Sequence, residues 1–169
     1  MTSATARSGT RSAPAEIPNS EPRRILAVDY GRKRMGLAIS DELQITAQPL
    51  CTLVRTNRRN DVHRLRDICR NHGVARILVG HPLHITGEAG EMAEEAAQFA
   101  ARLRKDLGIE VKLADERLTT WEAAQIVAQS SSPHRRKKSS IDDVAAAVLL
   151  REYLDRIRAH SEQVAGERE

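Results

Sequence analysis

One stretch near the start of the chain constrains the fold more than any other. The apolar run Ile25-Leu26-Ala27-Val28 leads into Asp29-Tyr30-Gly31, and after the basic turn Arg32-Lys33-Arg34 a second apolar run follows, Leu37-Ala38-Ile39. A continuous aliphatic run bounded by glycine is typical of a strand buried on both faces, and a glycine-bounded turn favours a hairpin back along it. The sequence therefore predicts a central strand with Asp29 at its carboxyl end.

Asp29 has two interpretations in that position. Open α/β sheets bind ligands at the carboxyl ends of their strands, so an acidic side chain there is a candidate for a site. An aspartate at a turn can instead accept hydrogen bonds from its own turn backbone. This stretch alone does not choose between the two.

The rest of the chain alternates strand and helix patterns. Residues 44–55 are rich in β-branched and apolar residues but contain Pro49, which is typical of an edge strand. Apolar spacing predicts helices over about 60–72 and 92–107, parallel strands over 75–80 and 110–118, and further helices over 119–128 and 141–158. This order predicts an α/β fold, a five-stranded mixed sheet flanked by helices with the first strand in its middle.

Length and composition indicate one domain. A chain of 169 residues has room for one domain with a proper core. Residues 1–22 hold three prolines and no apolar run that suits a signal peptide or a membrane span, so we expect a disordered tail there. We place the domain at 23–159 and a charged C-terminal tail at 160–169. Cys51 and Cys69 lack zinc-ligand spacing, and we expect reduced, buried thiols in a cytoplasmic protein that does not enter a membrane.

The charge of the chain points mildly to a polyanionic partner. There are 27 Lys plus Arg against 23 Asp plus Glu, and with aromatic residues at only 2% a base-stacking platform is not expected. The candidate nucleic-acid-binding residues are those of the basic turn and of a later basic loop, where four consecutive cations repel unless an anion neutralises them. They are Arg32, Lys33 and Arg34, and Arg135, Arg136, Lys137 and Lys138. Residues 55–76 hold seven arginines against two aspartates, which fits a solvated face at least as well as a contact surface.

Carboxylates carry the candidate chemistry, because the sequence has no Walker loop, paired CxxC or Cys/His nucleophile arrangement. Asp29, Glu116 and Asp142 each lie at the end of a predicted element. Three converging carboxylates repel one another unless they share divalent cations, and hard oxygen ligands select Mg2+ or Mn2+. Two such ions about 4 Å apart can activate a water and stabilise the leaving oxygen of a phosphodiester. The spacing of the three acids in the sequence does not show that they converge. If Glu116 follows a strand two places away from the strand of Asp29, the two residues are roughly 10 Å apart.

Four stretches of the chain, in this order and at these separations, carry a resemblance to a known family. They are Asp29-Tyr30-Gly31 with Gly36, Gly80-His81-Pro82-Leu83, Asp115-Glu116-Arg117-Leu118-Thr119-Thr120 and Ile141-Asp142-Asp143-Val144-Ala145-Ala146. They are similar to the signature stretches of the Holliday-junction-resolvase-like family of pre-16S ribosomal RNA nucleases, over about residues 24–153. The chain departs from the family pattern at His81, where Leu is usual, and at His84-Ile85-Thr86.

The resemblance implies an RNase H-like fold, a cytoplasmic bacterial protein, and divalent-metal hydrolysis of phosphodiester bonds during 5′-end maturation of precursor 16S rRNA. It also implies that Asp29, Glu116 and Asp142 are the metal-binding and catalytic acids.

Other functions stay open at this point. A Holliday junction resolvase acting on branched DNA needs two sites at a fixed spacing, and since no coiled coil or apolar stripe is evident we expect a monomer or a weak dimer. A non-catalytic nucleic-acid-binding factor in ribosome assembly or transcription would use the basic surface alone. A phosphate-binding domain of the actin-like kind would need two facing copies, and the chain has no internal repeat.

Overall fold

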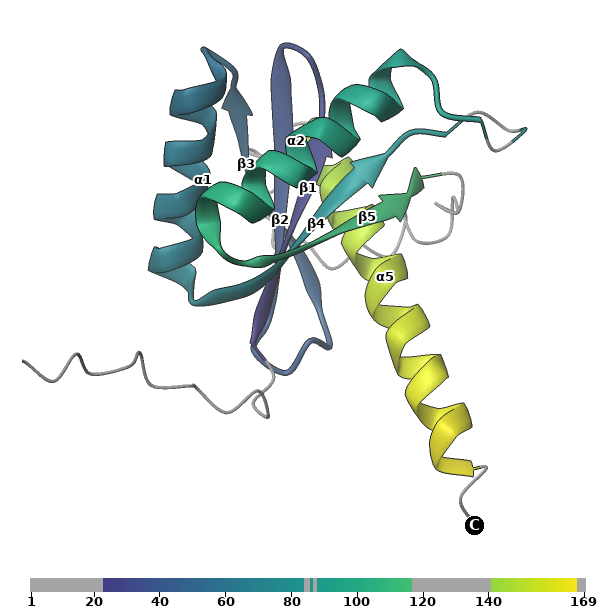
Figure 1. Cartoon of the computed structure of the whole chain (residues 1–169). Helices are drawn as coiled ribbons and strands as arrows, with labels where there is room; N and C mark the ends of the chain where they lie inside the picture. Colours follow the sequence, from purple (N-terminus) through teal and green to yellow (C-terminus); the bar gives the residue numbers. More distant parts are fainter. Residues whose placement is uncertain (1–22, 84–85, 87, 117–140, 167–169) are drawn as a thin grey trace, which may run out of the picture.

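The structure of the chain is a computed structural model that describes residues 23–83, 86, 88–116 and 141–166. Its elements alternate as the sequence predicts (Figure 1). The strands are β1 (Arg24–Tyr30), β2 (Arg34–Ser40), β3 (Ala47–Val54), β4 (Val74–His81) and β5 (Glu110–Asp115). The helices are α1 (Arg58–His72), α2 (Glu91–Leu107) and α5 (Ile141–Gly166).

The five strands form one mixed sheet in the order β3-β2-β1-β4-β5. β1 is antiparallel to β2 and parallel to β4, and β4 is parallel to β5. The strand that begins at Arg24 therefore lies in the middle of the sheet, as predicted. β3, which contains Pro49, is an edge strand, because proline cannot donate a hydrogen bond to a second neighbour.

The two faces of the sheet are covered by different helices. Leu26, Val28 and Tyr30 of β1 pack in one core cluster with buried side chains of α1 and α2. Ile25 and Ala27, which alternate with them, pack in a second cluster with α5. The central sheet is thus buried on both faces, which accounts for its continuous aliphatic runs.

α5 contacts its face of the sheet through small side chains. Ala27 and Ala38 on the strands meet Ala146 and Ala147 on the helix, and all four are fully buried. Small residues on both partners allow the helix backbone to lie close to the strands. The close approach matters for the site, because it fixes where the first turn of α5 lies.

Several element limits differ from those predicted. α5 runs to Gly166, past the predicted end near residue 158 and through the start of the tail that we placed at 160–169. β5 ends at Asp115, whereas the strand was predicted to reach residue 118. The predicted helix over 119–128 and the basic loop over 135–138 lie outside the described residues. Cys69 is buried and Cys51 half-buried, and both are free thiols.

Among the residues that the structure describes, no helix combines the length and the apolar character needed to cross a membrane.

Candidate active site

Asp29 lies on the α5 face of the sheet, near the carboxyl end of β1. It shares that face with Ile25 and Ala27 because side chains alternate along a strand, and Gly36 of β2 is its neighbour in the antiparallel pair. Burial, and to a smaller extent the negative charge of Asp142, raise the pKa of Asp29 from its ordinary 3.8 to about 6. The carboxylate is therefore costly to keep charged without a nearby cation.

Glu116 follows β5 directly, and β4 lies between β5 and β1. Gly80 of β4 removes the obstacle between them: a Cβ at that position would collide with Oε1 of Glu116. The Glu116 carboxylate therefore lies over β4, in the space that a side chain at position 80 would fill. Burial raises the pKa of Glu116 from 4.5 to about 7, with further contributions from the negative charges of Asp29 and Asp115. The Glu116 side chain thus reaches from the end of β5 over β4, toward the strand that carries Asp29.

Asp142 lies in the first turn of α5, against β2. A Cβ at Gly36 would collide with the backbone carbonyl of Asp142 and lie 2.7 Å from the amide nitrogen of Asp143. Gly36 thus allows the start of the helix to contact the strand beside Asp29. The Asp142 carboxylate forms an ion pair with Arg34, whose Nε is 3.2 Å from Oδ2.

The three predicted acids therefore lie at one edge of the sheet, although they come from β1, the residue after β5 and the start of α5. Their oxygen atoms suit Mg2+ or Mn2+, and burial together with neighbouring negative charge raises the pKa values of Asp29 and Glu116. The donor set and its charge fit a divalent-ion site. In the described part of the chain, however, no three His, Cys, Asp or Glu side chains are close enough together to hold one ion, and Asp142 is bonded to Arg34.

The predicted nucleic-acid-binding residues of the β1–β2 turn are exposed at the same edge. Arg32 pairs with two carboxylates of α2, with Nη2 at 2.9 Å from Glu91 and 2.8 Å from Glu95. Arg34 pairs with Asp142 as described, and the backbone carbonyl of Lys33 accepts a hydrogen bond from Arg55. Arg135, Arg136, Lys137 and Lys138 lie outside the described residues. Their part in binding stays a prediction.

Sequence reasoning missed what Gly80 does and that Arg34 pairs with Asp142. Gly80 was interpreted only as the end of a strand. Counting two residues at a time along β4 places it on the same face as Leu78, which packs against α5, so the sequence held a signal for its position. No sequence signal indicated the ion pair between Arg34 and Asp142, since these residues are far apart in the chain.

The chain is similar to a known protein family and to several curated relatives. Residues 23–156 match the model of a family described as RuvX, Holliday junction resolvase. A protein of Syntrophus aciditrophicus named "Putative pre-16S rRNA nuclease" is 44% identical over 134 residues, which cover 79% of this chain and 89% of the relative. A protein of the same name from Geobacillus kaustophilus is 41% identical over 80% of this chain and 99% of its own length.

The solved structures give the fold. The complex of Fowlpox virus resolvase with Holliday junction DNA superimposes with a TM-score of 0.51 at 13% identity, covering 79% of this chain and 98% of the resolvase. Together with the observed mixed sheet and its flanking helices, this likeness confirms the predicted RNase H-like fold.

Proposed function

This chain belongs to the Holliday junction resolvase family and is a nuclease, and we propose that it hydrolyses phosphodiester bonds of precursor 16S rRNA in the maturation of its 5′ end. The observation that carries the proposal is that Asp29, Glu116 and Asp142 lie at one sheet edge, where two glycines leave room for Glu116 and for the start of α5. Processing of ribosomal RNA also supports a cytoplasmic location.

Asp29, Glu116 and Asp142 are the residues that would hold Mg2+ or Mn2+. When bound, a pair of such ions supplies an activated water as the nucleophile and stabilises the leaving oxygen of the phosphodiester. Because their pKa values are raised, the carboxyl groups of Asp29 and Glu116 hold protons more tightly than ordinary carboxyls do. A divalent cation would displace these protons on binding, so metal binding would release protons. Arg34 is beside Asp142 and is placed to contact a phosphate at the same edge.

The test is a cleavage assay on a precursor 16S rRNA fragment that contains the 5′ flanking sequence, with Mg2+, Mn2+ or EDTA. We expect Asp29→Asn, Glu116→Gln and Asp142→Asn each to lose cleavage while RNA binding in EDTA is retained. Matched controls are Glu110→Gln, at the opposite end of β5 from Glu116, and Asp155→Asn, further along α5 from Asp142. Absence of cleavage by the wild type with every divalent ion would contradict the proposal and support a non-catalytic binding factor.

A second substrate is favoured by the description of the matched family, namely branched DNA. A four-way DNA junction in the same assay separates the two. Paired symmetric cuts on the junction, together with a dimer in sedimentation, would support junction resolution. We propose a monomer or weak dimer that cuts RNA, and expect inefficient cutting of the junction.

A further inference from the structure

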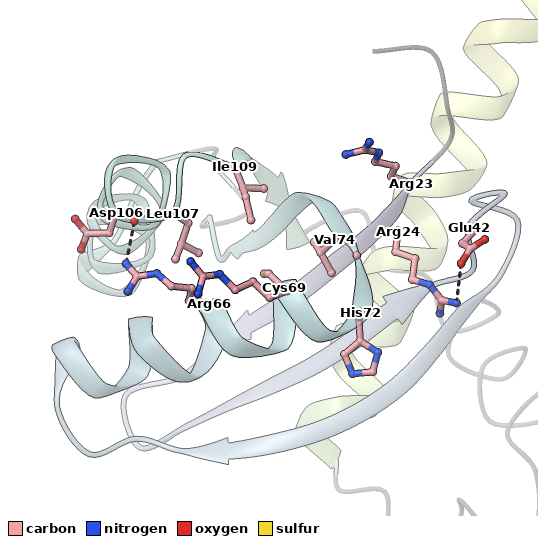
Figure 2. Close-up of a pocket in the computed structure, with 12 residues that line it drawn as sticks. Arg23, Arg24, Glu42, Arg66, Cys69, His72, Val74, Asp106, Leu107 and Ile109 are labelled. Carbon is pink, nitrogen blue, oxygen red and sulfur yellow. Dashed lines mark hydrogen bonds and ion pairs between the residues drawn. The ribbon is translucent and has the colours of Figure 1, made fainter. Parts of the chain in front are cut away.

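Two cavities lie away from the proposed cleavage site of Asp29, Glu116 and Asp142, along the surface where α1 and α2 pack side by side. One has a volume of about 690 Å3 and the other about 710 Å3, and both are lined by Arg66 and Asp106, so we treat them as one α1–α2 groove. Figure 2 shows the first cavity, in which Arg66 is bonded to Asp106 and Arg24 to Glu42. The arginines that line the groove are Arg23, Arg24, Arg58, Arg59, Arg66, Arg70 and Arg102.

The groove concentrates positive charge. It holds those seven arginines against two carboxylates, Glu42 and Asp106, an excess larger than the formal net charge of +4 of the whole chain. The sequence alone allowed two interpretations of the arginines in residues 55–76, as a solvated face or as a contact surface. Four of the seven arginines in that stretch, Arg58, Arg59, Arg66 and Arg70, line the groove. This favours a contact surface for these four, because a hollow lined by charges of one sign focuses the field that attracts an anion.

Some of these arginines are held in place and others are free to bind. Arg66 donates to the backbone carbonyl of Asp106 at 3.0 Å, and Arg102 pairs with the Asp106 carboxylate at 2.6 Å, so the middle of the groove is fixed. Arg58, Arg59 and Arg70 are exposed, and no side-chain hydrogen bond or ion pair joins any of them to another described residue. Three guanidinium groups are therefore available to an anion.

The position of the groove separates it from the cleavage site. α1 and α2 cover the face of the sheet opposite to α5, whereas Asp29 is on the α5 face. α1 begins near the β1–β2 turn, where the Arg55 amide donates to the Lys33 carbonyl, and ends beside the first residue of β4 at the opposite end of the sheet. A helix of 15 residues is about 22 Å long. The groove thus leads away from the carboxylates over most of the height of the molecule.

We propose that the α1–α2 groove binds the phosphate backbone of a base-paired segment of RNA that lies outside the cleavage position. This inference rests on the proposed function, because it takes nucleic acid as the substrate. Arginine forks bind phosphate oxygens in pairs, and the residues that line the groove include no Phe, Tyr or Trp on which an unpaired base could stack.

The test measures binding of a fluorescein-labelled 20-base-pair RNA duplex in EDTA, over a range of salt. The variant Arg58→Gln/Arg59→Gln/Arg70→Gln removes the three available cations at exposed helix positions, and glutamine retains good helix propensity. We expect at least a tenfold loss of affinity at low salt, and a salt slope that is shallower by about 2–3, because each lost phosphate contact removes about 0.9. The control Arg151→Gln/Arg156→Gln/Arg158→Gln removes the same charge from α5 and should lose much less affinity.

Two further measurements keep this test independent of fold and of catalysis. Arg59→Gln/Arg70→Gln, with an unchanged melting temperature, should give an intermediate loss of duplex affinity. In cleavage, the triple groove variant should raise KM for a substrate with a duplex stem and leave a six-nucleotide single strand unaffected. Wild-type duplex affinity in the triple variant would overturn the inference and indicate another occupant, such as an acidic protein, without touching the proposed cleavage. A wild type that never cuts RNA, yet binds the duplex through these arginines, would overturn the proposed function alone.

Discussion

At the scale of single residues, the site depends on the absence of a side chain at position 80. We predict that Gly80→Ala lowers cleavage by about 100-fold, because the new Cβ takes the space of the Glu116 carboxylate, and a displacement of about 1 Å can have an effect of that size. The melting temperature should not fall, since the colliding group is the flexible end of a side chain and alanine is otherwise better than glycine inside a strand. Cleavage rates and thermal melts of the purified variant check both parts.

A double-mutant cycle supplies the control for Gly80. If the alanine acts through Glu116, Gly80→Ala should cause no further loss of activity or of Mn2+ affinity in a Glu116→Ala background. Additive losses in the two variants would mean that position 80 acts on something other than this carboxylate.

Asp29 gives the second residue-scale prediction, which concerns stability in EDTA. The pKa of Asp29 is about 6 in the folded protein against an ordinary 3.8, so the folded state binds the proton more tightly than the unfolded chain does. The contribution of this group to the free energy of unfolding therefore falls as pH rises from about 4 to about 6. Asp29→Asn removes that loss, and we expect its melting temperature to exceed the wild-type value by about 2–5 °C at pH 8, after allowance for partial exposure, and by less at pH 5.

In the presence of Mn2+, we expect the wild type to have a higher melting temperature than the Asp29→Asn variant. An ion that binds the folded wild type raises its melting temperature, and the neutral amide of the Asp29→Asn variant cannot replace the lost carboxylate as a ligand. Glu94→Gln, at an exposed position of α2, serves as the comparison, and its melting temperature should differ from the wild-type value by the same amount at both pH values. If the melting temperature of the Asp29→Asn protein lies below that of the wild type by the same amount at pH 5 and pH 8, burial does not disfavour the charged form of the Asp29 carboxylate.

At the scale of elements, α1 is tied to the central hairpin by a buried ion pair. Asp61 is 1% exposed and accepts from Arg55 Nε at 3.0 Å, while Arg55 Nη1 donates to the Gly31 carbonyl at 3.0 Å. The same guanidinium lies over the ring of Tyr30, 4.7 Å from its centroid. This cluster holds the start of α1 against the turn that follows Asp29.

We predict that Asp61→Ala lowers the free energy of unfolding by about 3–5 kcal/mol, because it leaves the Arg55 charge buried without its carboxylate. Urea denaturation measures the change. Asp67→Ala on the same helix, where the carboxylate is half exposed, should change stability by no more than about 0.5 kcal/mol. Equal effects of the two substitutions would show that the buried pair has no special part in holding α1.

The elements show where prediction from sequence succeeds and where it fails. The central strand, the edge strand with Pro49 and the position of Asp29 near the carboxyl end of the central strand follow from apolar runs, proline chemistry and the glycine-bounded turn, all of which are local. The crossing of Glu116 over Gly80 and the pairing of Arg34 with Asp142 depend on the close approach of distant segments, and periodicity carries no information on those. The end of α5 was missed because positions 158–161 of the helix are exposed, so the buried apolar pattern stops before the helix does.

At the scale of the whole molecule, the chain has two groups of cations that are candidates for binding RNA. One is the α1–α2 groove, on the face opposite to α5. The other is the chain between Glu116 and Asp142, which holds the four consecutive cations 135–138. Glu116 and Asp142, which flank this segment in the sequence, lie at the carboxylate edge. The two groups of cations should therefore act on different parts of one RNA.

This division predicts opposite substrate dependence for two variants. Replacing Arg135, Arg136, Lys137 and Lys138 by alanine should weaken binding of a six-nucleotide single strand by about tenfold or more at low salt and flatten its salt dependence, since these charges are expected to contact phosphates near the cut. The triple groove variant should leave that short strand unchanged and weaken only the duplex. Affinities of both proteins for both RNAs, measured from 50 to 200 mM salt, separate the two contributions. If the loop variant binds the short strand as the wild type does, its cations are solvated and only the groove and the turn after β1 are left to hold the RNA.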